Sequence, residues 1–107
     1  MKAPLELLGN LFKRIFSTRV SFDDGSYIEF LNREAIVYAE QNGHRMEIVW
    51  YFQPGRVKGR VLRVTDISHW DSPHEAEQLS PQKKDEIQQK VVEYSHKRNI
   101  PLEIRKN

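Results

Sequence analysis

The alternation of apolar and polar residues predicts a series of β-strands between residues 18 and 70. The clearest example is the run "HRMEIVWYFQ", in which Met46, Ile48 and Trp50 fall on one face of a strand and Glu47 falls on the other. The neighbouring runs "TRVSF", "SYIEFL" and "EAIVYAE" are also rich in the β-branched and aromatic residues that favour strands. We therefore expect a twisted sheet of about five strands in this part of the chain.

Short turn sequences separate these runs and fix how the strands are joined. "DDG" ends at Gly25 and "QNG" ends at Gly43, and a glycine in each place allows the positive φ that a tight turn needs. "PG" at 54–55 then leads into "RVKGRVLRVTDISHW", which is predicted to be a fifth strand with a bulge at Gly59. Strands joined by turns this short must be antiparallel, so the pattern predicts a meander.

The apolar spacing changes from two to about 3.6 after residue 79, which predicts a helix over residues 80–99. Ser80 is a good N-cap and Pro81 suits the first helical turn. The apolar face that would cover the sheet consists of Ile87, Val91 and Tyr94. After the helix, "PLEI" is a short strand candidate.

The first 16 residues also have a helical apolar spacing, which predicts a short N-terminal helical segment that lies across the core. Together these elements predict an α+β fold, with an antiparallel sheet, a C-terminal helix and a short N-terminal helix. The length of 107 residues fits a single domain that spans residues 1–107.

Composition narrows the class of protein. Hydrophobic residues make up 38% and charged residues 30% of the chain, as expected for a soluble globular domain. There is no cysteine, and no apolar run approaches the ~20 residues of a transmembrane helix. The N-terminus lacks the pattern of a signal peptide. These features favour a cytoplasmic protein without disulfides and without a membrane partner.

The small net charge of +2 hides blocks of opposite sign. Six acids and two arginines between residues 21 and 52 give −4, and three acids between 71 and 79 give −3. The rest of the chain is basic. Local acidic blocks of this kind can select a partner through the field they create.

The stretch "ISHWDSPHEAEQLSPQ" carries the polar side chains that most resemble a chemical site. His69 and His74 are five residues apart with a proline between them, and no HExxH spacing accompanies them, so we expect no metal site. The carboxylates sit in a polar segment that would keep them ionised, which disfavours acid–base catalysis. Since no nucleophile motif or phosphate loop occurs either, we expect neither an enzyme nor a cofactor.

A nucleic-acid-binding domain remains the alternative interpretation. A basic strand over residues 56–63 carries Arg56, Lys58, Arg60 and Arg63, and it follows three aromatic residues at 50–52. Basic and aromatic side chains together can hold a single strand. An ordinary solvent-facing strand explains the same pattern, and no recognised nucleic-acid motif is present, so nucleic acid is not the favoured partner.

The run from Val61 to Ile104 resembles a known family. The features that carry the resemblance are Trp70, the segment Asp71-Ser72-Pro73-His74, the pair Leu79-Ser80 at the start of a helix, Ile87, and the closing "PLEI". These are similar to the C-terminal half of small bacterial immunity proteins from polymorphic-toxin and contact-dependent growth inhibition systems. The resemblance extends more loosely back to residue 21.

This resemblance implies a non-catalytic protein that binds a cognate toxin C-terminal domain, often a nuclease such as an RNase or tRNase. The immunity protein would block the active site or another surface that the toxin needs. The resemblance leaves open whether a host factor joins them in a larger complex. A nuclease groove is basic because it binds phosphate, so carboxylates on a rigid loop could occupy it. The predicted toxin-binding residues are Asp71, His74, Glu75 and Glu77, with Asp23 and Asp24 as a second acidic patch.

Overall fold

Two tight turns fold the first half of the molecule into an antiparallel sheet. The computed structural model describes residues 18–55 and 59–106. Its first sheet has the order β1-β2-β3-β4, and every neighbouring pair is antiparallel. The strands are β1 (Val20–Ser21), β2 (Tyr27–Asn32), β3 (Ala35–Ala39) and β4 (Arg45–Val49). Gly25 and Gly43 adopt φ values of 85° and 94° in the predicted turns, where a side chain would be strained.

The central strand β3 is buried on both faces, whereas β4 alternates between buried and exposed positions. On the inner face, Ile36 and Tyr38 of β3 are fully buried beside Met46 and Ile48 of β4. The outer face of β3 carries only alanines and one valine, and these small side chains are also buried. The alternation along β4 confirms the period-two pattern in the sequence.

The predicted long strand breaks at Trp50, and the chain then starts a second sheet. The backbone N–H of Trp50 donates to Glu34 O at 2.9 Å, which is the last bond to the first sheet. Because β3 begins just after Glu34, the residues beyond Trp50 have no partner there. They form β5 (Tyr51–Phe52), which pairs with β6 (Arg60–Arg63).

The second sheet has the order β5-β6-β7, and it contains the one parallel strand pair among the described residues. The predicted "PLEI" strand is β7 (Leu102–Arg105), which runs parallel to β6. It follows the C-terminal helix in the chain, whereas β6 precedes that helix. A purely antiparallel meander would not bring these segments together. The two sheets and the helix nevertheless confirm the predicted α+β class.

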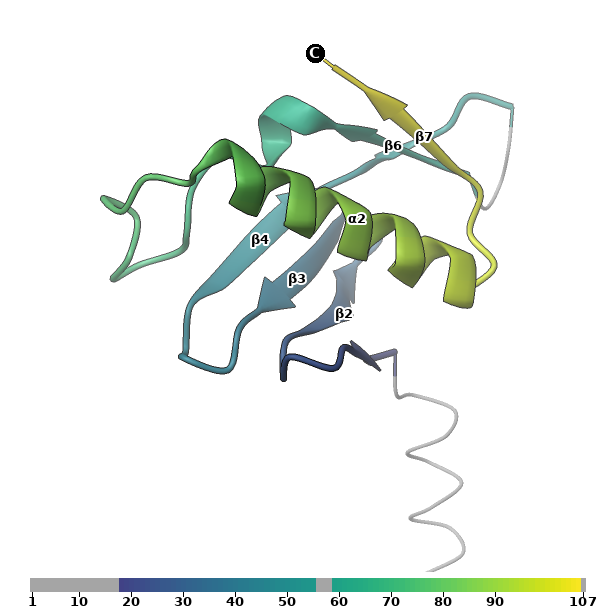
Figure 1. Ribbon diagram of the computed structural model, residues 1–107. Coiled ribbons are helices and arrows are strands. Elements are labelled where there is room, and N and C mark those ends of the chain that lie inside the picture. The colour runs from purple at the N-terminus through teal and green to yellow at the C-terminus, as the bar shows by residue number, and fades with distance from the viewer. Residues whose placement is uncertain (1–17, 56–58, 107) are drawn as a thin grey trace, which may run out of the picture.

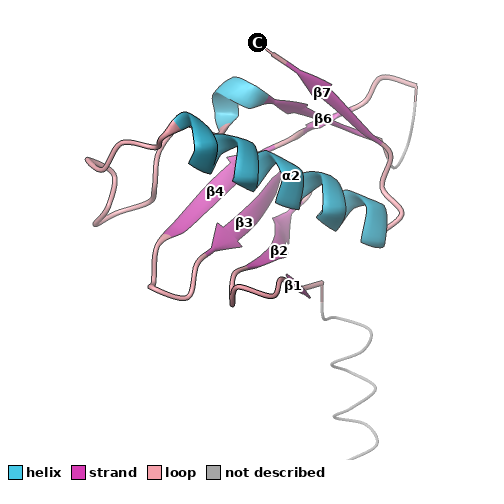
Figure 2. Ribbon diagram, viewed as in Figure 1, coloured by secondary structure: helices cyan, strands magenta, loops and turns pink. Residues whose placement is uncertain are grey.

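Helix α2 (Pro81–Lys97) lies across the inner face of the first sheet (Figure 1). As predicted, Ser80 is the N-cap, and its hydroxyl accepts a bond of 3.1 Å from the Lys83 N–H. The helix buries the predicted apolar face on the sheet, and the Tyr94 ring meets the Trp50 ring at 5.9 Å. Figure 2 shows the same arrangement of one helix over the strands.

Between β6 and α2 the chain forms a short 3-10 helix, η1 (Val64–Asp66), and then a loop over residues 67–80. Trp70 anchors this loop, because the residue is only 4% exposed and its ring stacks on that of Tyr38, with the ring centroids 6.1 Å apart. The predicted N-terminal helical segment over residues 1–16 lies outside the described residues.

Candidate functional site

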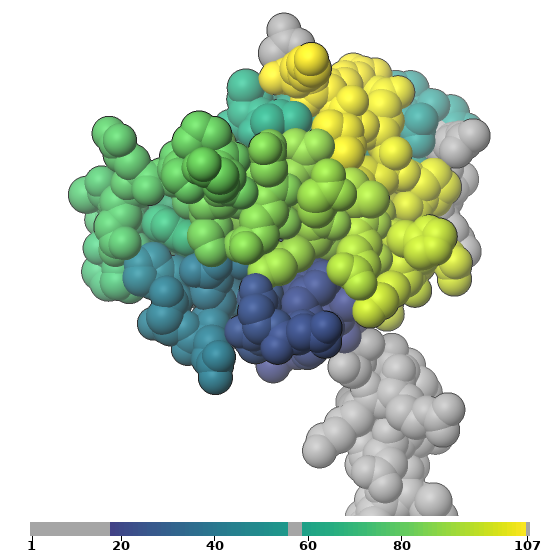
Figure 3. All heavy atoms as spheres, viewed as in Figure 1, coloured from purple at the N-terminus to yellow at the C-terminus, as the bar shows by residue number. Residues whose placement is uncertain are grey.

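Three segments that are far apart in the sequence meet at one end of the first sheet. They are the β1–β2 turn, the β3–β4 turn and the loop 67–80, and Figure 3 shows them following one another along one side of the molecule. A hollow of about 210 Å³ adjoins Asp24, Glu40 and Asn42, and a second of about 370 Å³ adjoins Glu40, Asn42 and Glu77. Because both hollows share Glu40 and Asn42, they form one continuous surface.

This surface collects acidic residues from both acidic blocks of the sequence. We call it the acidic end and define it by five carboxylates, Asp23, Asp24, Glu40, Glu75 and Glu77. The antiparallel topology explains the gathering, since alternate turns of a meander return to the same end of the sheet.

Asp71 attaches the loop 67–80 to the edge strand β4. Its Oδ1 accepts a bond of 3.2 Å from the Glu47 N–H, and its own N–H donates to Arg45 O at 2.8 Å. The Arg45 guanidinium lies 3.4 Å from the other carboxylate oxygen. Asp71 therefore continues the hydrogen bonding of the sheet into the loop, and the loop is held against the core.

Within the loop, Glu77 binds two histidine rings at once. Its carboxylate lies 3.0 Å from His44 Nε2 and 2.7 Å from His74 Nδ1. The two imidazole rings stack with centroids 3.7 Å apart. The His44 ring also makes a T-shaped contact with the Trp70 ring, with centroids 5.1 Å apart. The hydrogen bond from His44, followed by that from His74, lowers the pKa of Glu77 below its usual value.

Asp24 in the β1–β2 turn is fixed by Lys90 from the helix. The Lys90 ammonium lies 2.5 Å from Asp24 Oδ2 and 2.9 Å from the Ser26 hydroxyl. The hydrogen bond from Lys90 and the bonds from Ser26 hold the pKa of Asp24 far below its usual value.

A second lysine of the helix fixes Glu40 in the β3–β4 turn. Lys83 Nζ lies 2.7 Å from the Glu40 carboxylate, and the Tyr38 hydroxyl donates to the same carboxylate at 2.8 Å. Burial alone would raise the pKa of Glu40, but these two hydrogen bonds outweigh it and lower the pKa. Burial also raises the pKa of the Tyr38 hydroxyl well above its ordinary value, which keeps this hydroxyl a donor.

The six predicted site residues thus fall into two groups. Asp71, His74, Glu77 and Asp24 are bonded within the molecule. Asp23 and Glu75 are exposed, and within residues 18–55 and 59–106 neither makes a side-chain hydrogen bond or ion pair.

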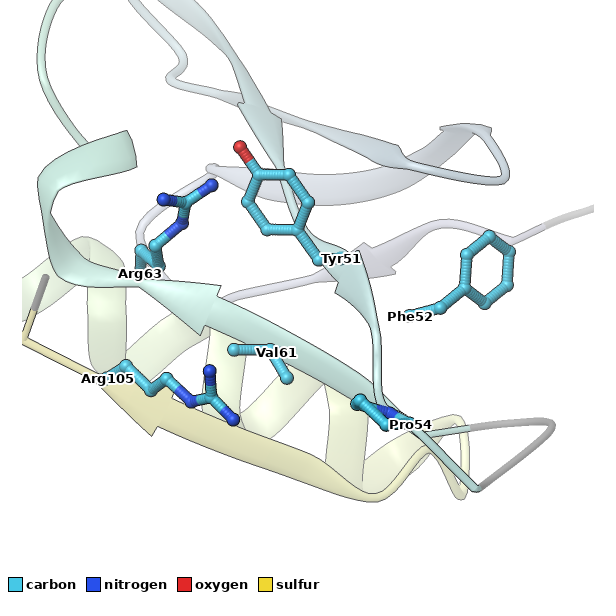
Figure 4. A pocket seen from close by; sticks show the side chains of 6 residues that line it. All are labelled: Tyr51, Phe52, Pro54, Val61, Arg63 and Arg105. Atoms are coloured by element: carbon cyan, nitrogen blue, oxygen red, sulfur yellow. The ribbon is translucent and has the colours of Figure 1, made fainter.

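The predicted basic strand contributes to a different surface, on the outer face of the second sheet. A pocket of about 230 Å³ is lined there by Tyr51, Phe52, Pro54, Val61, Arg63 and Arg105. Figure 4 shows the Arg63 guanidinium beside the Tyr51 ring, at 4.2 Å from its centroid, with Val61 between the two arginines. We call this surface the aromatic–arginine pocket.

Arg60 of the same strand does not line that pocket. It lies on the opposite face of β6, with its guanidinium 4.2 Å from the centroid of the Phe52 ring, and burial lowers its pKa. Arg56 and Lys58 lie outside the described residues.

Comparison with known proteins identifies the chain. The family model of Immunity protein 74 matches residues 31–105, which is more than half of the sequence. The chain belongs to this family. No curated protein and no solved structure matches it.

Membership of Immunity protein 74 confirms the resemblance to bacterial toxin-immunity proteins, and it gives the chain a toxin-neutralising immunity role. The matched range contains the β3–β4 turn, the loop 67–80 and helix α2, whereas the β1–β2 turn with Asp23 and Asp24 precedes it. Proteins of this kind are generally non-catalytic. No helix among the described residues is long and apolar enough to cross a membrane.

In this Immunity protein 74 chain, sequence reasoning missed Glu40 of the acidic end and two residues that bind its carboxylates, His44 and Lys83. Each contacts a residue more than 30 positions away, so no local pattern reports it. The turn "QNG" was the available signal, because it places Glu40 and His44 on either side of a hairpin tip at the end of the sheet that the β1–β2 turn also occupies.

Proposed function

We propose that this Immunity protein 74 chain neutralises a nuclease toxin domain, an RNase or tRNase delivered to the cytoplasm by contact-dependent growth inhibition. In this proposal the acidic end occupies the basic groove in which the toxin would bind its nucleic-acid substrate. The observation that carries the proposal is the gathering of Asp24, Glu40 and Glu77, from three separate segments, around two adjoining hollows. Asp23 and Glu75 lie in the same turn and loop, next to or two residues from these carboxylates.

The internal bonds of this surface support a rigid interface. Asp71 ties the loop to β4, and Lys90 and Lys83 tie Asp24 and Glu40 to the helix. A surface that is already ordered loses little conformational entropy when it binds. Asp71, His74, Glu77 and Asp24 therefore shape the interface in this proposal, and they also contribute charge to it.

Asp23 and Glu75 are the direct contacts in this proposal. Both are exposed and neither has an internal partner among the described residues, so each can pair with a lysine or arginine of the toxin. Exposed charges at the edge of an interface act mainly on the association rate, since they steer the encounter over a distance of about a Debye length.

The test is a binding titration against the polypeptide encoded by the C-terminal end of the gene immediately upstream, paired with growth rescue on co-expression. The informative variant is the double substitution Asp23→Lys/Glu75→Lys. A matched control is Glu34→Lys, because Glu34 is exposed in the β2–β3 turn at the opposite end of the sheet.

We expect tight binding and rescue by the wild type, at least tenfold weaker binding by the double variant, and no change in the control. If the double variant binds the toxin as tightly as the wild type does, the acidic end is not the interface. Absence of both binding and rescue would reject this toxin as the partner.

The aromatic–arginine pocket favours one alternative, single-stranded nucleic acid as a ligand. Tyr51 and Phe52 are 36% and 44% exposed, and two arginines lie beside them, which suits base stacking and phosphate contact. A single-stranded RNA oligonucleotide should then bind more weakly as salt rises, and Arg63→Glu with Arg105→Glu should abolish the binding. If the double variant binds RNA as the wild type does, this alternative fails.

A further inference from the structure

We propose that His44, His74 and Glu77 form a binding site for a divalent transition-metal ion, with Zn²⁺ as the best match. Two imidazole nitrogens and a carboxylate oxygen lie within 4.8 Å of one another in this cluster. The sequence alone predicts no metal site, because His69 and His74 are unsuitably spaced. The fold replaces His69 with His44, which comes from the β3–β4 turn and precedes His74 by 30 residues.

The donor atoms match the chemistry of zinc. Zn²⁺ binds imidazole nitrogen and carboxylate oxygen at about 2.0–2.2 Å, so two ligands around a tetrahedral ion are about 3.3 Å apart. The Glu77 carboxylate lies 3.0 Å from His44 Nε2 and 2.7 Å from His74 Nδ1. A small widening of these two contacts admits an ion in place of the hydrogen-bonding protons.

The backbone holds both ligand-bearing segments before any ion arrives. The His44 N–H donates to Asn42 Oδ1 at 3.0 Å, and His44 O accepts from the Glu40 N–H at 2.7 Å. In the loop, the Glu77 N–H donates to His74 O at 3.0 Å. Ligands on preordered segments lose less entropy on binding, which favours measurable affinity for a three-ligand site.

Only one of the two nitrogens of the His44 ring has a hydrogen-bond partner among the described residues. Its Nδ1 is buried and has no hydrogen-bond partner among the described residues, whereas its Nε2 is directed at Glu77. Contact with the Trp70 ring fixes the orientation of His44. This residue is therefore the fixed ligand of the three.

The His74 ring must turn when the ion binds. The two rings now stack with an angle of 14° between their planes, and the lone pairs of parallel rings do not meet at a point. His74 is free to make this adjustment, since its side chain is 31% exposed on a surface loop. The neighbouring hollow of about 370 Å³ leaves room for a water molecule as the fourth ligand.

The test uses the untagged full chain and the metal alone, so it does not depend on the identity of any toxin. Isothermal titration calorimetry with Zn²⁺ gives the stoichiometry and affinity, and the absorption of bound Co²⁺ reports tetrahedral coordination. The ligand variants are His74→Ala, Glu77→Gln and His44→Gln. His69→Ala is the matched control, since His69 is exposed in the same loop and contacts only Ser68 through its ring nitrogen.

We expect one ion per chain, an affinity at least tenfold weaker in each ligand variant, and wild-type affinity in the control. Circular dichroism shows whether each variant is folded, and if His44→Gln is not, the His74 and Glu77 variants decide. The proposal is overturned if the wild type binds no ion, or if folded His74→Ala and Glu77→Gln bind as tightly as the wild type. It is equally overturned if His69→Ala loses the ion.

Discussion

Lys90 on helix α2 lies 2.5 Å from the Asp24 carboxylate in the β1–β2 turn, and this pair joins the helix to the far edge of the first sheet. The Lys90 side chain is only 12% exposed, whereas that of Asp24 is 52% exposed. The pair therefore has one partner at the core boundary and one in solvent, so screening by water weakens it.

The first prediction concerns the acid stability of the fold. The pKa of Asp24 is lowered by folding, so its carboxylate stabilises the fold above its unfolded pKa of about 4. This contribution is lost as the pH falls from there toward the depressed folded pKa. In urea unfolding measured between pH 7 and pH 3, wild type should lose stability more steeply below about pH 4 than Asp24→Asn. Parallel curves for the two proteins would contradict the role of this pair.

A second prediction concerns the Tyr38 hydroxyl, which donates to Glu40 at 2.8 Å and lies 3.3 Å from Lys90 Nζ. Tyr38→Phe removes this link between the two lysine pairs and should lower the free energy of unfolding by about 1 kcal/mol. Tyr27→Phe is the control, because the Tyr27 hydroxyl makes no hydrogen bond within the described part of the chain. If chemical denaturation gives the two variants equal free energies of unfolding, the Tyr38 hydroxyl does not stabilise the fold through these contacts.

The third prediction concerns the order of the loop 67–80. Asp71→Ala leaves the Glu47 N–H without its acceptor and releases the Arg45 contact, so amide exchange in the loop should become faster. The expected cost to stability is about 1–2 kcal/mol, because a hydrogen bond to a charged group contributes about 1.5–3 kcal/mol and solvent screening reduces this at an exposed contact. Glu75→Ala should change neither quantity. Hydrogen-exchange mass spectrometry distinguishes the two variants, and unchanged loop protection in Asp71→Ala would show that the Asp71 side chain does not hold the loop.

A fourth prediction rests on the proposed toxin interface. If Asp23 and Glu75 steer the encounter, raising the salt from 50 to 500 mM should slow association of the wild type more than that of Asp23→Lys/Glu75→Lys. Stopped-flow measurements against the toxin domain give both rates. A salt dependence that is the same in the two proteins would assign the steering to other charges.

Local patterns predicted those parts of the fold that local interactions decide. The hairpin turns at Gly25 and Gly43 and the helix start capped by Ser80 each depend on residues within a few positions. The break at Trp50 depends on where a neighbouring strand begins, and the pairing of β6 with β7 joins segments about 40 residues apart. No period-two pattern contains that information.

The candidate site shows the same division. Both acidic blocks were visible in the sequence, but which carboxylates are already bonded was not. The partner of Glu77 is His44, 33 positions away, and that of Asp24 is Lys90, 66 positions away. These contacts are set by the packing of the loop and the helix on the sheet, so only the folded structure separates Asp23 and Glu75 from the other acids.

The two lysines that fix Asp24 and Glu40 have a consequence for discrimination between partners. Lys83 and Lys90 place positive charge among the carboxylates of the acidic end, so this surface is a mosaic rather than a uniformly negative patch. A uniform patch would attract any basic protein in the cell, whereas a mosaic repels a partner whose charges are out of register. If the acidic end is the toxin-binding surface, we expect Lys83 and Lys90 to reduce binding to unrelated basic proteins as well as to hold the fold together.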